Sequence, residues 1–346
     1  MKHKKNPEKQ GRRQCNLRLG VLVLLLIGFF ISPTSFANDM SECMTDMMQH
    51  ADDSTTIGVL RLQCQKQIHD GTDRVQDKES SVVSERFRED KEHVLQPFTL
   101  MAHKPNYILI GAYNTAGYDS TLYQEQFDDP SLHTDDTESQ FQLSVKFPLA
   151  VNLFDTMDIY AAYTNRSFWQ VYNENSSPFR ETNHEPEGWL QFNPKWEFFG
   201  FTNTANIFGI VHQSNGRGGV LSRSWNRLYA NFLVERGNLG LSVKPWYRLP
   251  EDDSDDDNPG ITDYLGHYEI RAAYKWNNHV FSVMSRNNLE SGFEKGTVEL
   301  SWSFPLWNYP YLKGYVQYFT GYGESLIDYN QYVNKFGVGF AVTDWL

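Results

Sequence analysis

The sequence is poor in cysteine, has no excess of basic residues and contains no long apolar run, and each absence excludes a class of protein. Three cysteines in 346 residues rule out a disulfide-dense scaffold or a cysteine-rich zinc module. The formal net charge is −12, so nucleic acid is not an expected partner, because phosphate binding needs a basic face. The mean hydropathy of −0.55 rules out a helical membrane protein unless its spans are few.

Aromatic residues, in contrast, are abundant. The chain has 23 Phe, 19 Tyr and 9 Trp, which make up 15% of its residues. That is too much apolar material for a disordered chain, and aromatic side chains fit the pleated surface of a sheet. The composition therefore favours an all-β protein, and the length suits either two ordinary domains or one large β-barrel.

The N-terminus has the three parts of a secretory signal peptide. Basic residues between Lys2 and Arg18 precede the apolar run Leu19–Ile31, and Ser35–Ala37 supplies the small residues that signal peptidase accepts. The apolar run is shorter than the roughly 20 residues that a membrane-spanning helix needs. We therefore predict that residues 1–37 are a signal peptide that is cleaved off, rather than an anchor that stays.

Residues 38–104 form a separate polar segment. Within it, Ile57–Ile68 has an imperfect helical spacing of apolar residues. Cys43 and Cys64 both lie in this exported part, where disulfides persist, so we expect them to pair, with free buried thiols as the alternative. We predict an N-terminal periplasmic extension that consists of a short helical hairpin, clipped by this disulfide, and a polar linker over about 71–96.

From about residue 105 the sequence alternates between apolar residues and small or polar ones. Phe141–Phe147 is one such run, and Phe336–Thr343 is another. A period of two with one apolar face predicts β-strands. The runs start near Tyr107, Gln140, Asp158, Gly188, Asn206, Ser224, Leu241, Tyr264, His279, Thr297, Leu312 and Val333.

Residues 105–346 thus allow about 20 residues for each strand and its connection, enough for a membrane-spanning strand of about 9–11 residues plus a turn or loop. Tyr and Trp gather near the ends of the runs, as in the aromatic girdles of outer-membrane barrels. A soluble β-sandwich would also alternate. However, the polar and small residues of the second face indicate a wet or tightly filled lumen rather than a second packed sheet. We therefore predict a twelve-stranded antiparallel transmembrane β-barrel over 105–346, in the outer membrane of a Gram-negative bacterium.

One predicted hairpin carries residues with catalytic chemistry. His212 and Ser214 are two positions apart and share the parity of Phe208, so in a strand they point to the apolar, lipid-facing side. By the same argument, Asn226 on the next strand points outward. If His212 pairs with Asn226, the turn centres on Gly218–Gly219, where glycine suits a positive φ. The sequence alone thus places serine, histidine and asparagine on one patch of the outer wall.

These three residue types can form a nucleophile triad. The Ser214 hydroxyl would attack an ester carbonyl, His212 would take its proton, and Asn226 would orient the imidazole. A neutral asparagine avoids the cost of a carboxylate at a lipid-facing site. His-x-Ser alone would fit an ordinary surface pair, and it is the asparagine in register that favours the triad.

The sequence around this hairpin resembles the outer-membrane phospholipase A family. The motif that carries the resemblance runs over His212–Arg217 and Ser222–Arg227. Further matches are Ser176–Asn183, Lys244–Tyr247, Asp257–Pro259 and Gly321–Asn330. The resemblance covers about 105–346 and does not explain residues 38–104.

The resemblance implies a phospholipase A1/A2 of the serine type, which hydrolyses acyl esters of phospholipids and lysophospholipids. It implies calcium dependence and activation by homodimerisation in the membrane. Carried over by motif, Ser214 is the nucleophile, His212 the base and Asn226 the orienting residue. The Gly216 amide would donate a hydrogen bond to the oxyanion.

The resemblance also implies a calcium site with oxygen ligands. Backbone oxygens of Arg217 and Ser222 from one subunit, together with Ser176 of the other, would hold the ion in the dimer. Asp257 matches an acidic position that is tied to calcium in the family. The turn Gly218–Val220 departs from the family pattern, in which this stretch is more polar, and this bears on a second calcium site in the monomer rather than on the triad.

Two other classes stay open at this point. A porin or adhesin would have a wide polar lumen and no reason to gather His212, Ser214 and Asn226 on the outer face. An outer-membrane protease would place acidic and histidine residues on the loops above the rim. The acidic run Glu251–Asp257 is expected to be mainly a solvated loop, with Asp257 as the exception.

Overall fold

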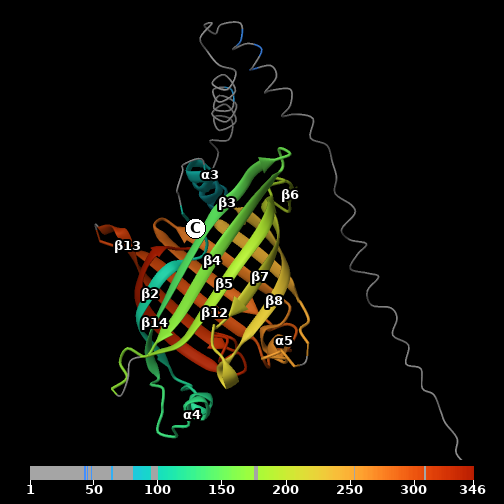
Figure 1. Ribbon diagram of the computed structural model, residues 1–346. Coiled ribbons are helices and arrows are strands. Elements are labelled where there is room, and N and C mark those ends of the chain that lie inside the picture. The colour runs from blue at the N-terminus through green and yellow to red at the C-terminus, as the bar shows by residue number, and fades with distance from the viewer. Residues whose placement is uncertain are drawn as a thin grey trace, which may run out of the picture. The chain divides into compact units, whose positions relative to one another are not determined.

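The structure is a computed structural model of the chain (Figure 1), and it describes residues 43, 45, 48, 64, 81–94, 100–174, 178–252, 254–307 and 309–346. The chain divides into two units, Met1–Lys78 and Glu79–Leu346. The predicted signal peptide lies outside the described residues. None of the helices among these residues is long and apolar enough to cross a bilayer.

The second unit is a single antiparallel sheet that closes into a barrel (Figure 1). The strands of the wall are β2 (Asn106–Asn114), β3 (Thr137–Leu153), β4 (Met157–Trp169), β5 (Phe179–Phe192), β7 (Phe201–Ser214), β8 (Ser224–Arg236), β9 (Leu239–Arg248), β10 (Tyr268–Trp276), β11 (His279–Arg286), β12 (Thr297–Leu306), β13 (Tyr309–Gly321) and β14 (Val333–Thr343). Two short strands, β1 (Met101–Ala102) and β6 (Glu197–Phe198), pair with β3 and β7. Each wall strand pairs with the next, and β14 pairs with β2, so the wall has no free edge.

The predicted twelve-stranded barrel is confirmed, and three of the predicted strand starts are wrong. β7 begins at Phe201, five residues before Asn206. Tyr264 lies in the short helix α5 (Ile261–Leu265), which ends at Gly266 with a φ of 66°, and the strand begins only at Tyr268. β5 begins at Phe179 rather than near Gly188. Its first half is polar on both faces, so it lacks the apolar alternation on which the prediction depended.

The wall separates an apolar outer face from a charged lumen. On β7, Phe208 and Ile210 are 40% and 51% exposed, whereas Val211, which points inward, is 1% exposed. Glu138 and Arg180 meet in the lumen with an Nε–Oε2 distance of 2.9 Å, and Arg180 also pairs with Asp328.

Further ion pairs fill the lumen along its length. Lys335 lies 2.6 Å from Glu324, and Lys104 lies 2.5 Å from Glu185. A cavity of about 160 Å³ remains in the lumen, lined by Lys104, Glu185 and Glu324 among other side chains. Ion-paired side chains thus fill much of the lumen, and no second sheet packs against the wall.

The two ends of the barrel differ. Short turns join β3 to β4, β8 to β9, β10 to β11 and β12 to β13. The other end carries the longer connections, with α4 (Thr121–Phe127), the 3₁₀ helix η1 (Gly219–Leu221) and α5 (Figure 1). In transmembrane barrels the short turns face the periplasm and the long loops face outward. The loop between β7 and β8 therefore lies at the outer end.

A helix stands where the polar linker was expected. Helix α3 (Val82–Val94) lies at the short-turn end of the barrel, opposite α4 and α5 (Figure 1). The Val83 amide donates to Glu235 at 2.8 Å, and Lys146 pairs with Asp90 at 2.5 Å. The helix is thus held by strand residues far away in the sequence, which is why the polar composition of this stretch did not predict it. This part of residues 38–104 belongs to the barrel unit.

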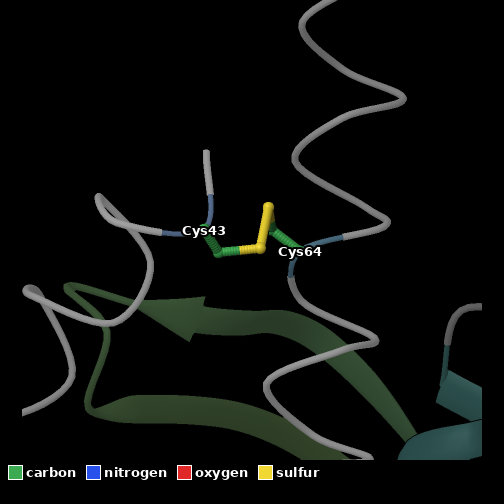
Figure 2. The surroundings of a disulfide bond; sticks show 2 residues. All are labelled: Cys43 and Cys64. Atoms are coloured by element: carbon green, nitrogen blue, oxygen red, sulfur yellow. A yellow bond between two sulfur atoms is a disulfide. The ribbon is translucent and has the colours of Figure 1, made fainter. Parts of the chain in front are cut away.

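In the first unit, Cys43 and Cys64 form a disulfide (Figure 2). Their Cα atoms are 5.7 Å apart, which is an ordinary separation for bonded cysteines. Both cysteines are helical, and most of the predicted helical hairpin lies outside the described residues.

Replacing both Cys43 and Cys64 by serine should leave the barrel largely intact, because its strands all belong to the other unit. The circular dichroism spectrum of the variant should match that of the wild type. In the wild type, mass spectrometry of non-reduced protein should find one bond between these cysteines. Two free thiols in that experiment would contradict the pairing.

Candidate active site

The hairpin of β7 and β8 brings the three predicted catalytic residues to one patch. Its register pairs His212 with Asn226 and Ser214 with Ser224. His212 and Ser214 are the outward-facing residues at the loop end of β7, and Asn226 is near the start of β8. The patch therefore lies on the lipid-facing side of the wall, close to its outer end.

The connection between these strands is longer than a tight turn. The segment from Asn215 to Arg223 forms a loop that contains η1, and the Asn215 side chain closes it by donating to the Leu221 carbonyl at 2.7 Å. Gly219 has a φ of 65°, as predicted for the turn, whereas Gly218 has an extended backbone. Gly216, the predicted oxyanion donor, also has a positive φ, of 63°.

His212 and Asn226 are joined directly. The distance between His212 Nδ1 and Asn226 Oδ1 is 2.9 Å, and Asn226 Nδ2 donates to Glu251 Oε1 at 3.0 Å. Since the amide nitrogen is used by Glu251, the amide oxygen faces the imidazole and Nδ1 carries the hydrogen. Nε2 is then left as the acceptor, which is the tautomer that a general base needs.

Ser214 has polar neighbours on both sides. Its cross-strand partners are Ser224 on β8 and His184 on β5. His184 Nδ1 lies 2.6 Å from the Tyr163 hydroxyl. Among the described residues, the Ser214 hydroxyl makes no hydrogen bond to His212. Such bonds are often loose in the absence of substrate and tighten when it binds.

The inward-facing residues of the hairpin anchor it from inside the barrel. Gln213 Oε1 accepts hydrogen bonds from Trp225 Nε1 at 2.8 Å and from Arg227 Nη2 at 3.3 Å. Trp225 is fully buried. The outward-facing patch is thus built on a rigid wall, which is the kind of support that a catalytic geometry requires.

The residues predicted to bind calcium are partly brought together. Ser222 Oγ donates to Asp257 Oδ2 at 2.5 Å, so two oxygen-bearing side chains meet beside the loop. The Arg217 guanidinium donates to the carbonyls of Phe179 and Arg180, which ties the loop to the start of β5. Ser176 lies outside the described residues.

The oxygen atoms of these predicted ligands suit calcium better than a transition metal. Within the described ranges, no group of three or more His, Cys, Asp and Glu side chains is placed to hold a metal ion. A site made of backbone carbonyls, a hydroxyl and one carboxylate would not form such a group, and oxygen ligands of this kind are those that calcium prefers.

Two residues of the patch are not predicted by the sequence. The sequence places Glu251 in a solvated acidic loop and gives no signal for His184. Their positions depend on how the loop after β9 folds back and on which residue of β5 lies beside Ser214. Neither of these contacts can be recognised from the local sequence.

Comparison with known proteins gives a consistent result. The family model described as Phospholipase A1 matches residues 83–342. The chain is 38% identical to Phospholipase A1 of Klebsiella pneumoniae over 252 residues, which are 72% of this chain and 84% of that protein.

Solved structures agree with this. Outer membrane phospholipase A from Escherichia coli superposes with a TM-score of 0.66 at 37% identity, over 72% of this chain and all of that one. A Salmonella typhi outer membrane phospholipase dimer with bound calcium matches with the same TM-score and identity, over 72% of this chain and 94% of that one. A further Escherichia coli structure, with a TM-score of 0.66 and 37% identity over 72% of this chain and 94% of that one, carries an active-site replacement of an asparagine by alanine.

Proposed function

Because the chain belongs to the phospholipase A1 family of the outer membrane, we propose that Ser214, His212 and Asn226 form its catalytic triad. The substrates are phospholipids and lysophospholipids, calcium is the cofactor, and the active form is a homodimer. The observation that carries the triad is the hydrogen bond between His212 and Asn226 on the lipid-facing wall, two positions along β7 from Ser214.

In the first half of the reaction, His212 Nε2 takes the proton of Ser214 as its oxygen attacks the acyl carbonyl. The tetrahedral intermediate collapses when His212 returns a proton to the leaving lipid oxygen. In the second half, His212 activates a water molecule that hydrolyses the acyl-enzyme. Asn226 keeps the imidazole in one orientation throughout, with the hydrogen of Nδ1 directed at its amide oxygen.

The position of the triad explains how such a substrate is reached. The patch lies on the outside of the barrel near its outer end, and Leu228, two residues beyond Asn226, is 47% exposed. Lipids of the outer leaflet lie against this face, so an acyl ester can meet Ser214 without leaving the membrane. The filled lumen gives no support to a porin function.

The oxyanion has two candidate stabilisers. The Gly216 amide is two residues from Ser214 and is a suitable donor. Backbone oxygens of Arg217 and Ser222, the Asp257 carboxylate and Ser176 of the second subunit are proposed to hold calcium. The bound ion would add positive charge beside the developing oxyanion. The Salmonella typhi relative, a dimer with bound calcium, supports this assignment.

The proposal is tested by measuring fatty-acid release from mixed detergent–phospholipid micelles. We expect chelation of calcium to lower turnover by about a hundredfold or more, because oxyanion stabilisation of this kind is worth that much.

Ser176→Ala should raise the calcium concentration needed for activity and weaken cross-linking of the dimer, with the fold unchanged. Ser177→Ala, which changes the next residue in the chain, is the matched control. Full activity in a demonstrably monomeric preparation would show that the dimer is not required.

A further inference from the structure

The loop after β9 folds back over the start of β8. The Leu249 amide donates to the Asn226 carbonyl at 2.8 Å, so the chain is anchored next to Asn226 as it leaves the strand. Two residues later, Glu251 is partly buried and its Oε1 accepts from Asn226 Nδ2 at 3.0 Å. Both the backbone and the side chain of Asn226 are therefore held by this loop.

We propose that Glu251 is a positioning residue that fixes the orientation of the Asn226 amide and thereby the tautomer of His212. This inference rests on the proposed triad and extends it by one residue. In the part of the chain that the structure describes, the Asn226 side chain bonds only to His212 and Glu251. Glu251 forms no ion pair among these residues. The arginine at the end of β9, Arg248, pairs with Asp256 and not with Glu251.

An asparagine in a triad has a problem that an aspartate does not have. Rotating its amide by half a turn exchanges the oxygen and the nitrogen, and the nitrogen would then donate to His212 Nδ1. Nε2 would carry the hydrogen and could not take the proton of Ser214. The two oxygens of a carboxylate are equivalent, so an aspartate cannot fail in this way.

Glu251 removes the wrong orientation. An ionised carboxylate only accepts hydrogen bonds, so only the amide nitrogen of Asn226 can face it. The amide oxygen then has to face His212, as the 2.9 Å distance to Nδ1 requires. Because the acceptor is charged, this bond is stronger than one between neutral groups. The triad itself has no carboxylate, and Glu251 supplies one as the next residue after Asn226 in this chain of hydrogen bonds.

The test compares variants of the full chain in calcium-saturated mixed micelles. Glu251→Ala should lower kcat about tenfold with little change in KM, because it acts on the base and not on lipid binding. Glu251→Gln, whose side-chain amide can donate as well as accept, no longer excludes the flipped Asn226 amide and should fall between the wild type and Glu251→Ala. Asp252→Ala removes the same charge from the same loop and should behave like the wild type.

A double-mutant cycle separates positioning from a general effect of the loop. If Glu251 acts through Asn226, then Glu251→Ala should cause no further loss in the Asn226→Ala background. An additive loss, an equal loss in Asp252→Ala, or a changed calcium requirement with normal kcat would overturn the inference.

Ser214→Ala, assayed alongside, distinguishes failure of the positioning role from failure of the triad. If it is inactive while Glu251→Ala is fully active, the positioning role fails alone, and if Ser214→Ala is active, the triad itself fails.

Discussion

Replacing Ser214 by alanine should lower the turnover of phospholipid by about four to six orders of magnitude. The change removes the only proposed nucleophile and leaves the wall around it in place. His212→Ala should cost as much, and the double variant should be no worse than either single one, because both residues serve the same step. Fatty-acid release from mixed micelles at saturating calcium measures all three.

Ser224→Ala is the matched control for this loss. Ser224 is the cross-strand partner of Ser214 on β8, so it offers the same hydroxyl one strand away. It should retain near-normal activity, and a serine-directed sulfonyl fluoride should modify Ser214 in both the wild type and this variant. Asn226→Ala should lose less than Ser214→Ala, since it only orients the base. Labelling of a different serine would overturn the assignment of the nucleophile.

Replacing Arg180 by methionine should destabilise the barrel by about 3–5 kcal/mol, because it removes the cation that lies between two buried carboxylates. Arg180 is 2% exposed and donates to Glu138 from Nε at 2.9 Å and from Nη2 at 3.1 Å. Asp328 would lose the same partner. Denaturant unfolding in lipid vesicles, followed by tryptophan fluorescence, measures the change in the free energy of unfolding.

Two further variants show whether unpaired charge is the cause. Arg236→Met, an exposed arginine at the opposite end of the wall, should change the free energy of unfolding by less than about 0.5 kcal/mol. Glu138→Gln combined with Arg180→Met should recover part of the loss, because one of the stranded carboxylates is then neutral. If the double variant is less stable than Arg180→Met alone, packing rather than charge dominates this region.

The wall of the barrel could be predicted from sequence because each strand repeats a simple local rule. One residue faces lipid and the next faces the lumen, so parity alone put His212 and Ser214 outside and Arg227 inside. The pairing of His212 with Asn226 followed from a turn centred on residue 219, and the structure has this register. In a barrel, such local rules determine much of the final geometry.

What the sequence did not predict depends on contacts between distant segments. Helix α3 is held at its start by Glu235, more than a hundred residues away, and its own residues give little helical pattern. Glu251 reaches Asn226 only because the loop after β9 turns back over β8. The first half of β5 is polar on both sides because its inward-facing residues pair with charged residues of the lumen. This pairing cannot be recognised from the periodicity of the local sequence.

The junction between β2 and β14 has a consequence for how the protein assembles. Every other pairing in the wall links strands that follow one another in the chain and can form as hairpins, whereas this seam joins Asn114 to Lys335. Lys335 also reaches Glu138, 197 positions away, and both side chains are buried. Until the last strand arrives, two sheet edges stay open and Glu138 lacks this cation. Pairing of β14 with β2 therefore closes the wall and brings Lys335 to Glu138 in the same step, and we expect this seam to form after the hairpins.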